Sequence, residues 1–351
     1  MRLPAPLLAV LLPGVLLASG CAAFSDSSAT EDGPRVAAAF YPLQYVAQRV
    51  AGDLAEVTTL TSPGAEPHDL EPTIKETAEI TEADLVVFEK DFQPAIDDAV
   101  EQNAEGVVLD AAEVVGLRTV DEEHAEDEHA DAHEDEAAHE DEAAHEDEAA
   151  HEDEAGHEDE HAEEEGHTED DGHDHDHAGG LDPHFWQDPL RMAELGDAVA
   201  EELSDLDPDH ADTYADNAAE LRADLTALDE AYADGLAGCE RTTVVVSHDA
   251  FGYLGKYGLE FAPVAGLSPD AEPTPADLGR LQELIEELGI TTVFSERLAS
   301  PRLTRTLAED LGLATAVLDP VEGLTAETED EDYLSLMEQN LSALQEANAC
   351  P

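Results

Sequence analysis

The first part of the chain alternates short apolar runs with longer runs of helical spacing. Apolar runs bounded by turn residues are typical of buried strands, and the longer periodic runs are typical of helices. Strands are predicted over residues 35–40, 56–60, 84–88 and 107–109. Helices are predicted between them, over residues 43–51, 73–80 and 94–102. Such alternation predicts a parallel sheet with helices on both faces.

Two helical patterns occupy the middle of the chain. The first covers residues 190–203, and the second begins at Pro208, with Asp207 as the expected N-cap. The second pattern continues without interruption to about residue 237, and its apolar positions are Tyr214, Leu221, Leu225, Leu228 and Tyr232. Roughly thirty residues give about 45 Å of helix. Because this is long for a globular domain, we expect the helix to join two lobes.

The last third of the chain repeats the alternation. Strands are predicted over residues 242–246, 259–264, 291–294 and 314–318, and helices over residues 251–257, 275–288, 301–311 and 333–347. About 260 residues remain once the leader and the histidine-rich segment described below are set aside, which is enough for two domains of ordinary size. The predicted fold class is α/β.

Residues 119–178 interrupt this alternation with a segment of extreme composition. Between Asp121 and His177 there are twelve histidines, thirty carboxylates and no lysine or arginine. Four near-identical six-residue units begin at His133, His139, His145 and His151. So polar a segment has almost nothing to bury, so we expect it to be disordered in the absence of metal.

The regular histidines of this segment decide between two interpretations of it. A solvated acidic linker would explain the carboxylates, but it has no use for evenly spaced imidazoles. Imidazole and carboxylate are ligands that a first-row divalent cation accepts. We therefore predict metal capture, with accessory ligands that include His167, His173, His175 and His177.

The N-terminus resembles a bacterial lipoprotein leader. Arg2 precedes a short apolar run at residues 7–17, which is too short to span a bilayer comfortably. Ala18-Ser19-Gly20-Cys21 resembles a lipobox, and this implies cleavage after residue 20 and lipidation of Cys21. An ordinary signal peptide with an incidental cysteine is the alternative. We expect residues 21–34 to tether the protein to the outer face of the cell membrane, or the protein to be periplasmic.

The charge balance excludes nucleic acid as a partner. The chain has 87 acidic and 14 basic residues, for a formal net charge of −73. Outside the histidine-rich segment 57 acids still face the 14 bases. Such a surface repels a polyanion. It also indicates a protein that works in high salt, where screening reduces self-repulsion.

Two cysteines remain besides Cys21. Cys239 and Cys350 are far apart in the sequence, and an extracytoplasmic compartment permits oxidation. We predict a disulfide that ties the C-terminus to the start of the second lobe. Two free buried thiols are the alternative.

Four histidines lie outside the histidine-rich segment. His68 follows the second predicted strand, His184 precedes a helix, and His248 closes the Val244-Val245-Val246 strand. In open α/β sheets ligands bind beyond the carboxyl ends of the strands, so these three side chains can converge in the cleft between the lobes. His210 begins the long helix, and we interpret it as a surface residue.

Acidic residues at two further strand ends complete a candidate metal site. Asp319 and Glu296 each follow a predicted strand. Three imidazoles and one carboxylate form a four-coordinate zinc site. Any one histidine alone would be explained as a cap or a hydrogen-bonded loop residue. Three at strand ends, in a chain with a histidine-rich segment, favour a metal.

Four short motifs resemble those of a known family. They are Pro67-His68-Asp69-Leu70-Glu71-Pro72, Asp182-Pro183-His184-Phe185-Trp186, Ser247-His248-Asp249-Ala250-Phe251-Gly252-Tyr253 and Phe294-Ser295-Glu296. From about Arg35 to the C-terminus the chain resembles the zinc/manganese solute-binding lipoproteins of ABC importers, cluster A-I, zinc-uptake type. The resemblance implies two Rossmann-like lobes with parallel sheets, joined by one long helix, with metal in the inter-lobe cleft.

The resemblance also implies a division of the chain and a set of ligands. The expected division is a signal peptide (1–20), a tether (21–34), an N-terminal lobe (35–118 plus 179–207), an insert (119–178), a linker helix (208–238) and a C-terminal lobe (239–351). The implied ligands are His68, His184, His248 and Asp319. Some zinc members have an acid immediately before the first ligand, where this chain has Pro67. Glu66, Glu296 and water therefore remain alternatives to Asp319.

The function that the resemblance implies is extracytoplasmic capture of Zn²⁺ and its delivery to the permease of an ABC importer. We expect a monomer that is not an enzyme. Manganese members tend to have a carboxylate where His248 stands, and imidazole suits zinc, although Mn²⁺ is the alternative metal.

Two other classes compete with an importer subunit. The first is a surface zinc buffer or adhesin that works without a transporter, and the sequence distinguishes it poorly from an importer subunit. A zinc hydrolase would need an open metal position and a general base, as in His-Glu-x-x-His, and the sequence has no such motif.

Overall fold

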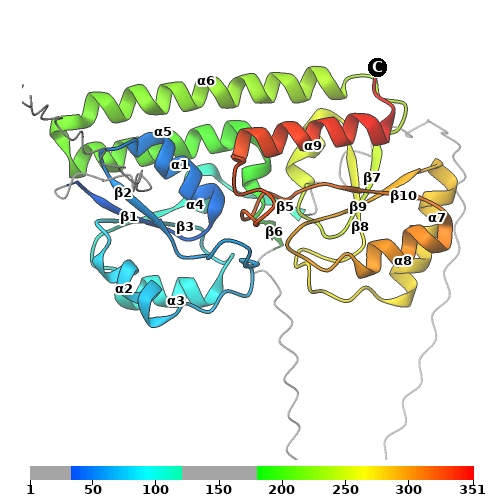
Figure 1. Cartoon of the computed structure of the whole chain (residues 1–351), viewed down its shortest axis with the longest axis horizontal. Helices are drawn as coiled ribbons and strands as arrows, with labels where there is room; N and C mark the ends of the chain where they lie inside the picture. The colour runs from blue at the N-terminus through cyan, green and yellow to red at the C-terminus, as the bar shows by residue number, and fades with distance from the viewer. Residues whose placement is uncertain (1–32, 121–179) are drawn as a thin grey trace, which may run out of the picture.

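Two parallel four-stranded sheets form the framework of the molecule (Figure 1). The computed structural model describes residues 33–120 and 180–351. The first sheet has the order β2-β1-β3-β4, with β1 (Arg35–Ala38), β2 (Glu56–Thr59), β3 (Leu85–Phe88) and β4 (Val107–Asp110). The second has the order β10-β9-β7-β8, with β7 (Thr243–Val246), β8 (Glu260–Pro263), β9 (Thr292–Ser295) and β10 (Ala314–Val317). The predicted α/β class with two lobes of parallel sheet is confirmed.

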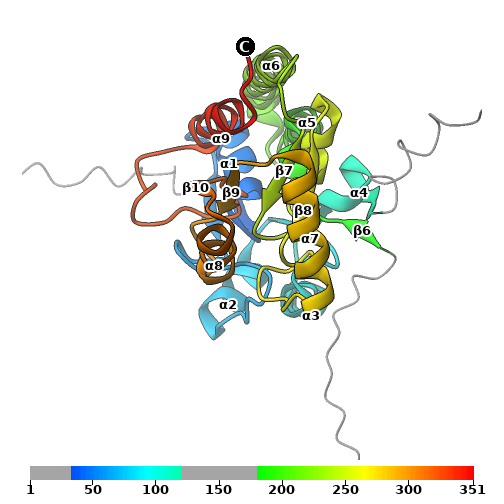
Figure 2. The ribbon, with the colours of Figure 1, turned by 90° about the vertical axis from the view of Figure 1, so that its right-hand side faces the viewer.

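Helices cover both faces of each sheet, as the alternation predicts. In the first lobe these are α1 (Tyr41–Ala51), α2 (Ile74–Glu82), α3 (Pro94–Asn103) and the short α4 (Ala111–Val115), which the sequence pattern did not reveal. The start of α2 is fixed by a capping box between Thr73 and Glu76, and Pro94 opens α3. Figure 2 shows α5, α6 and α9 gathered on one side of the sheets, with α2, α3 and α8 on the other.

One of two long helices, α6 (Ala211–Leu236), runs over both lobes, and the other, α5 (Pro189–Leu206), lies beside it over the first lobe (Figure 1). The prediction of one uninterrupted helix from Pro208 is wrong at its start, because a 3₁₀ turn (Pro208–His210) precedes α6. Asp207 does not cap α6, since its carboxylate instead binds the His210 ring and the Tyr214 hydroxyl. His210 is exposed, as interpreted from the sequence.

The second lobe contains α7 (Pro275–Leu288), α8 (Arg302–Leu311) and α9 (Tyr333–Asn348). The helix predicted over residues 251–257 is a 3₁₀ turn (Gly252–Tyr257). The two glycines in this turn, Gly252 and Gly255, weaken an α-helix. Helix α9 reaches back to the first lobe, where Tyr333 stacks on Tyr45 and donates its hydroxyl hydrogen to the Trp186 carbonyl at 2.6 Å.

One apolar core runs through both lobes. It includes the first sheet, the inner faces of α5, α6 and α9, and strand residues Val244 and Val246 of the second lobe. A smaller core of seven buried residues lies under α7 and α8: Val245, Val264, Leu281, Ile285, Ile290, Val293 and Leu307. The continuous core limits how far the two sheets can move relative to one another. None of the helices in the described ranges combines the length and apolar character needed to cross a membrane.

A two-stranded hairpin marks the base of the histidine-rich segment. Strands β5 (Arg118–Thr119) and β6 (Leu181–Asp182) are antiparallel, and the Val120 amide donates to the Gly180 carbonyl at 2.6 Å. Residues 121–179 therefore begin and end at neighbouring points, and an insertion closed this way costs little stability. The leader (1–20), most of the tether, Cys21, and the accessory ligands His167, His173, His175 and His177 lie outside the described residues.

The structure joins Cys239 to Cys350 in a disulfide across a sequence separation of 111 residues. Cys239 follows α6 and Cys350 follows α9, so the bond fixes the C-terminal helix to the end of the long helix. Removing a native disulfide typically costs about 2–5 kcal/mol, because the unfolded chain gains conformational freedom.

We expect replacement of both Cys239 and Cys350 by Ser to lower the free energy of unfolding by about 2–5 kcal/mol. Urea unfolding of the soluble form, with and without reductant, measures this change. Reductant should have the same effect on the native protein and none on the double variant. Two thiols that react with an alkylating reagent in the oxidised native protein would contradict the bond.

Candidate metal centre

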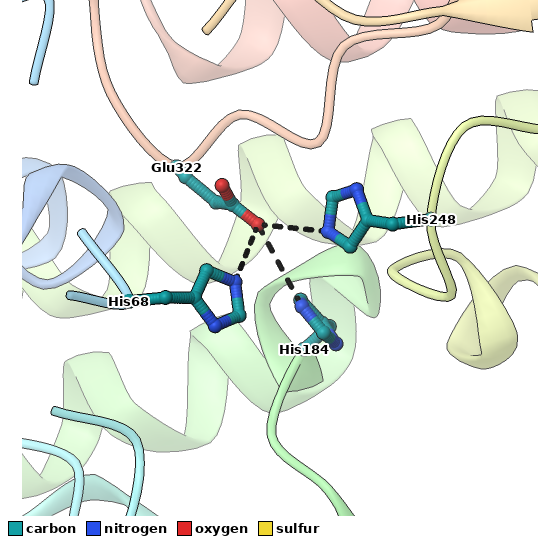
Figure 3. Close-up of side chains that lie close together, drawn as sticks. All are labelled: His68, His184, His248 and Glu322. Carbon is teal, nitrogen blue, oxygen red and sulfur yellow. Dashed lines mark ion pairs between the residues drawn. The ribbon is translucent and has the colours of Figure 1, made fainter. Parts of the chain in front are cut away.

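The three histidines predicted from strand ends come together between the two lobes (Figure 3). His68 lies in the loop after β2, His184 directly after β6, and His248 just after β7. Their ring centroids are 5.5–5.9 Å apart. All three residues are buried, and the most exposed of them, His68, has only 6% of its surface exposed. The carboxyl ends of the two sheets thus face one another, as expected for a ligand site in an open α/β fold.

Glu322 supplies the carboxylate of this cluster. Its Oε1 atom lies 3.5 Å from Nε2 of His68, 3.6 Å from Nε2 of His184 and 3.5 Å from Nε2 of His248. These four atoms all lie within 4.8 Å of one another. The distances exceed those of strong hydrogen bonds to a carboxylate. They approach the edge of about 3.3 Å that a tetrahedron has when its centre-to-ligand bonds are about 2.0 Å, as around zinc.

The ligand atoms of this cluster lack hydrogen-bond partners among the described residues. They are Nε2 of His68, Nε2 of His184, Nε2 of His248, and both carboxylate oxygens of Glu322. A buried polar atom without a partner is costly, so several that point at one place indicate a shared ligand. Imidazole nitrogens and a carboxylate oxygen fit a divalent cation of the zinc type.

Carboxylates on the far side of two rings fix their orientation. Nδ1 of His184 lies 2.9 Å from the Asp182 carboxylate, and Nδ1 of His248 lies 2.8 Å from Glu296. Such pairs direct Nε2 toward a metal and raise its basicity. Glu296, considered as a ligand from the sequence, therefore orients a ligand instead.

The loop around His68 is held by different contacts. The Glu66 carboxylate accepts the His68 amide at 3.0 Å and lies 3.8 Å from its Nε2. Gln93 donates to the Pro67 carbonyl at 2.9 Å, and the Phe92 ring packs edge-on against the imidazole. Glu66 thus shapes the loop and is not part of the four-atom group.

The structure does not bring Asp319, the fourth ligand predicted from the sequence, into this group of donor atoms. Its carboxylate accepts one hydrogen bond from Arg297 Nε and another from the Val321 amide, both at 2.9 Å. These contacts turn the side chain into its own loop and away from the imidazoles. Glu322, three residues later in the same loop, was missed. The only signal for it was a second carboxylate between Pro320 and Gly323.

The electrostatics of the site differ from one ring to the next. Burial lowers the pKa of His184 in spite of its contact with Asp182. Burial alone would also lower the pKa of His248, but Glu296 and Glu322 outweigh it and raise the pKa to about 10. Burial alone would raise the pKa of Glu322, but His248 and His68 hold it below its usual range. The metal-free site therefore keeps a proton on His248 at neutral pH.

Comparison with known proteins gives a consistent result. The profile of the family described as ZnuA, zinc-uptake complex component A, periplasmic, matches residues 36–347. The chain is 32% identical over 343 residues to the zinc-binding lipoprotein AdcA of Streptococcus pneumoniae serotype 4, which covers 95% of this chain and 60% of that protein. It is also 32% identical over 342 residues to the high-affinity zinc uptake system protein ZnuA of Bacillus subtilis. That alignment covers 95% of this chain and 94% of ZnuA. The chain thus spans about 60% of the length of the AdcA relative.

Solved structures of the same fold include a zinc complex. Zn(II)-bound AdcA from Streptococcus pneumoniae has a TM-score of 0.66 at 29% identity, covering 90% of this chain and 58% of that one. The laminin-binding protein Lmb of Streptococcus agalactiae, described as bifunctional with adhesin and metal transporting activity, has a TM-score of 0.68 at 25% identity. That match covers 90% of this chain and 99% of Lmb.

The raised pKa of His248 predicts that metal binding expels a proton. In the folded protein His248 stays protonated up to about pH 10, whereas in the unfolded chain it titrates near the ordinary value of about 6.5. The contribution to metal-free stability is thus complete below about pH 6.5 and lost as pH rises through about 10. Since a metal needs the neutral ring, we expect Zn²⁺ binding at pH 8 to release about one proton.

Calorimetric titration at pH 8, in two buffers of different ionisation enthalpy, counts the released protons. Glu296→Gln should reduce the count toward zero, because it removes the charge that raises the pKa. Glu309→Gln, on the exposed face of α8, is the matched control and should leave the count unchanged. A native protein that releases no proton would contradict the assignment.

Proposed function

This chain belongs to the zinc-uptake complex component A family, and from that premise we propose that it captures Zn²⁺ outside the cytoplasm and delivers it to an ABC importer. The names of the relatives, zinc-binding for AdcA and zinc uptake for ZnuA, support the choice of metal. The permease of the importer is the proposed protein partner, and the proposed working form is a monomer.

The observation that carries this proposal is the buried group of His68, His184, His248 and Glu322. Its four donor atoms point at one place between the lobes, at spacings that suit a tetrahedral cation. Ligands drawn from both lobes would couple metal binding to closure of the cleft, and separation of the lobes would release the metal.

The donor set favours zinc over manganese. Three imidazoles and one carboxylate form a borderline-soft, four-coordinate environment, whereas Mn²⁺ prefers a larger share of oxygen ligands. His248 supplies an imidazole at the position where the family resemblance leads us to expect a carboxylate in a manganese-selective protein.

The geometry argues against catalysis at this centre. A catalytic zinc keeps an open coordination position for water or substrate, while four protein ligands close the shell. Within the described ranges the four-residue group is buried on every member. We therefore place the protein among binding components and not among zinc hydrolases.

A surface zinc buffer or adhesin is the second candidate function. The observation that favours it is the likeness to Lmb, whose description includes adhesin activity alongside metal transport. Chromosomal neighbours that encode a permease and an ATPase would favour the importer, and their absence together with binding to laminin would favour the adhesin.

We further propose that Cys21 carries the lipid anchor and that the domain division expected from the sequence holds. AdcA is named a lipoprotein, which supports an extracytoplasmic, membrane-attached location. The antiparallel pair β5–β6 supports an insertion between residues 120 and 180 of the N-terminal lobe.

We expect Ala at His68, His184 or His248, and Gln at Glu322, each to weaken Zn²⁺ binding at least about 100-fold, or ~2.8 kcal/mol. Each change removes one of four metal bonds and leaves the other donors buried. Competition with a chromogenic chelator measures the affinity. His210→Ala, on the surface, is the control and should bind as the native protein does. Two site variants that bind within about threefold of the native protein would show that the centre is misassigned.

The insert has a different proposed role, that of accessory collector. Its repeats lack a fixed framework, so its ligands must be ordered when metal binds, and each site is weak. Its negative charge raises the local cation concentration near the cleft. The hairpin β5–β6 places the base of the insert, at Gly180, four residues from His184.

Deletion of residues 121–177 should remove several weak zinc equivalents and leave one tight one. The deletion keeps Ala178-Gly179 as a two-residue connection between Val120 and Gly180, a length that suits a hairpin. Titration with elemental analysis counts the equivalents, and uptake should slow mainly when zinc is scarce. The weak sites should also fade as pH falls through about 6.5. Loss of the tight site, or an unchanged weak stoichiometry, would contradict this division of roles.

A further inference from the structure

The backbone immediately before the carboxylate ligand is strained. Val321 has a φ of 61°, in the left-handed region, and its side chain is fully buried. This region is unfavourable for any residue with a Cβ atom, and for a β-branched residue it is a genuine outlier. Such outliers persist only where surrounding contacts hold them, and they concentrate at functional sites. Here the next residue is Glu322, whose carboxylate faces the three imidazoles (Figure 3).

Asp319 supplies the contacts that hold Val321. Its Oδ1 atom accepts the Val321 amide at 2.9 Å, and its Oδ2 atom accepts Arg297 Nε at 2.9 Å. The backbone of Asp319 is itself clamped by Asn340, which donates to its carbonyl at 2.6 Å and accepts its amide at 2.9 Å. The carboxylate is therefore a rigid acceptor that fixes the turn leading to Glu322.

The same loop is bound on both sides to segments of the first lobe. The Pro320 carbonyl accepts hydrogen bonds from Trp186 Nε1 at 2.8 Å and from Gln187 Nε2 at 2.5 Å. The Leu324 carbonyl accepts the Gly64 amide at 2.7 Å. Trp186 and Gln187 follow His184, and Gly64 precedes His68 by four residues. The loop conformation is thus tied to the lobe arrangement that brings the imidazoles together.

We propose that Val321 is a positioning residue whose left-handed backbone aims Glu322 at the metal in the closed arrangement and relaxes when the metal leaves. Asp319 is the lock on this conformation. In this inference, which rests on the proposed zinc function, the bound state carries the strain, and relaxation withdraws the carboxylate ligand. The strain therefore speeds release of an ion that four buried ligands would otherwise hold for a long time.

Glycine and alanine at position 321 separate backbone strain from lost packing. Both remove the valine methyl groups, but only glycine adopts a positive φ without penalty. We expect Val321→Gly to release Zn²⁺ at least about fivefold more slowly than Val321→Ala, which corresponds to ~1 kcal/mol. Stopped-flow transfer of zinc to an excess of chelator measures the rate. Leu318, also buried and without a positive φ, is the matched control. There the glycine variant should release zinc no more slowly than the alanine variant.

Single variants of Asp319 test whether its carboxylate holds the backbone of Val321 in place, without altering Val321 itself. Asp319→Asn keeps an oxygen acceptor for the Val321 amide and should release zinc within about threefold of the native rate. Asp319→Ala removes the acceptor and should accelerate release at least about tenfold, and adding Val321→Gly to it should restore part of the loss. A direct ligand role for Asp319 would instead make both single variants lose zinc alike.

Two results would overturn the inference. Equal release rates for the glycine and alanine variants at position 321, within about twofold, would mean that Val321 keeps its conformation after release. Equal zinc release rates for the Asn and Ala variants at position 319 would mean that the Asp319 carboxylate does not hold the conformation of Val321. In both cases the tight zinc site would stand. Only a native protein that fails to bind Zn²⁺ would remove the proposed function together with this inference.

Discussion

The structure depends on burying three imidazoles and a carboxylate against one another. Such a group is unfavourable in an apolar interior unless a cation shares the lone pairs or protons neutralise them. The protein meets part of this cost in advance, because Asp182 and Glu296 hold two of the rings and the residues around Asp319 hold the loop of Glu322. Among the described residues, the Nε2 atoms of the three histidines and the carboxylate oxygens of Glu322 still lack hydrogen-bond partners, and these atoms face one another.

The same requirement explains why the site lies between two sheets and not within one. Each lobe provides ligands at the carboxyl ends of its strands, so neither lobe alone satisfies a four-coordinate cation. The lobes are joined by α6 and by the core beneath it, which limits how far they can separate. Under the proposed function, metal binding and lobe closure would be one equilibrium, and strain in the loop of Glu322 would shift that equilibrium toward release.

Polar contacts link the insert base to this equilibrium. The Tyr253 hydroxyl donates to the Asp182 carbonyl at 3.0 Å and accepts the Arg118 amide at 3.0 Å. Both strands of the hairpin at which the insert begins and ends are thus attached to the second lobe. Because Asp182 also orients His184, the strand that follows the insert is part of the support of the metal centre.

The sequence by itself determined the strands of the two parallel sheets, most of the α-helices, and their order. Apolar runs and helical spacing located the strands of both sheets to within one or two residues, and strand ends located three histidines that the structure brings together. These features are local, because periodicity, caps and strand ends depend on residues that are near in the chain. The cysteine pair was also readable, since only two candidates remained.

Only the tertiary structure decided which carboxylate completes the site. Asp319 and Glu322 lie in one loop, and the sequence offers no reason to prefer the second. Arg297 and Asn340, each about twenty residues away in the sequence, bind the first carboxylate and its backbone and turn the chain so that the second faces the imidazoles. The direction of a loop side chain depends on such distant partners, whereas the position of a strand end depends only on its neighbours in the sequence.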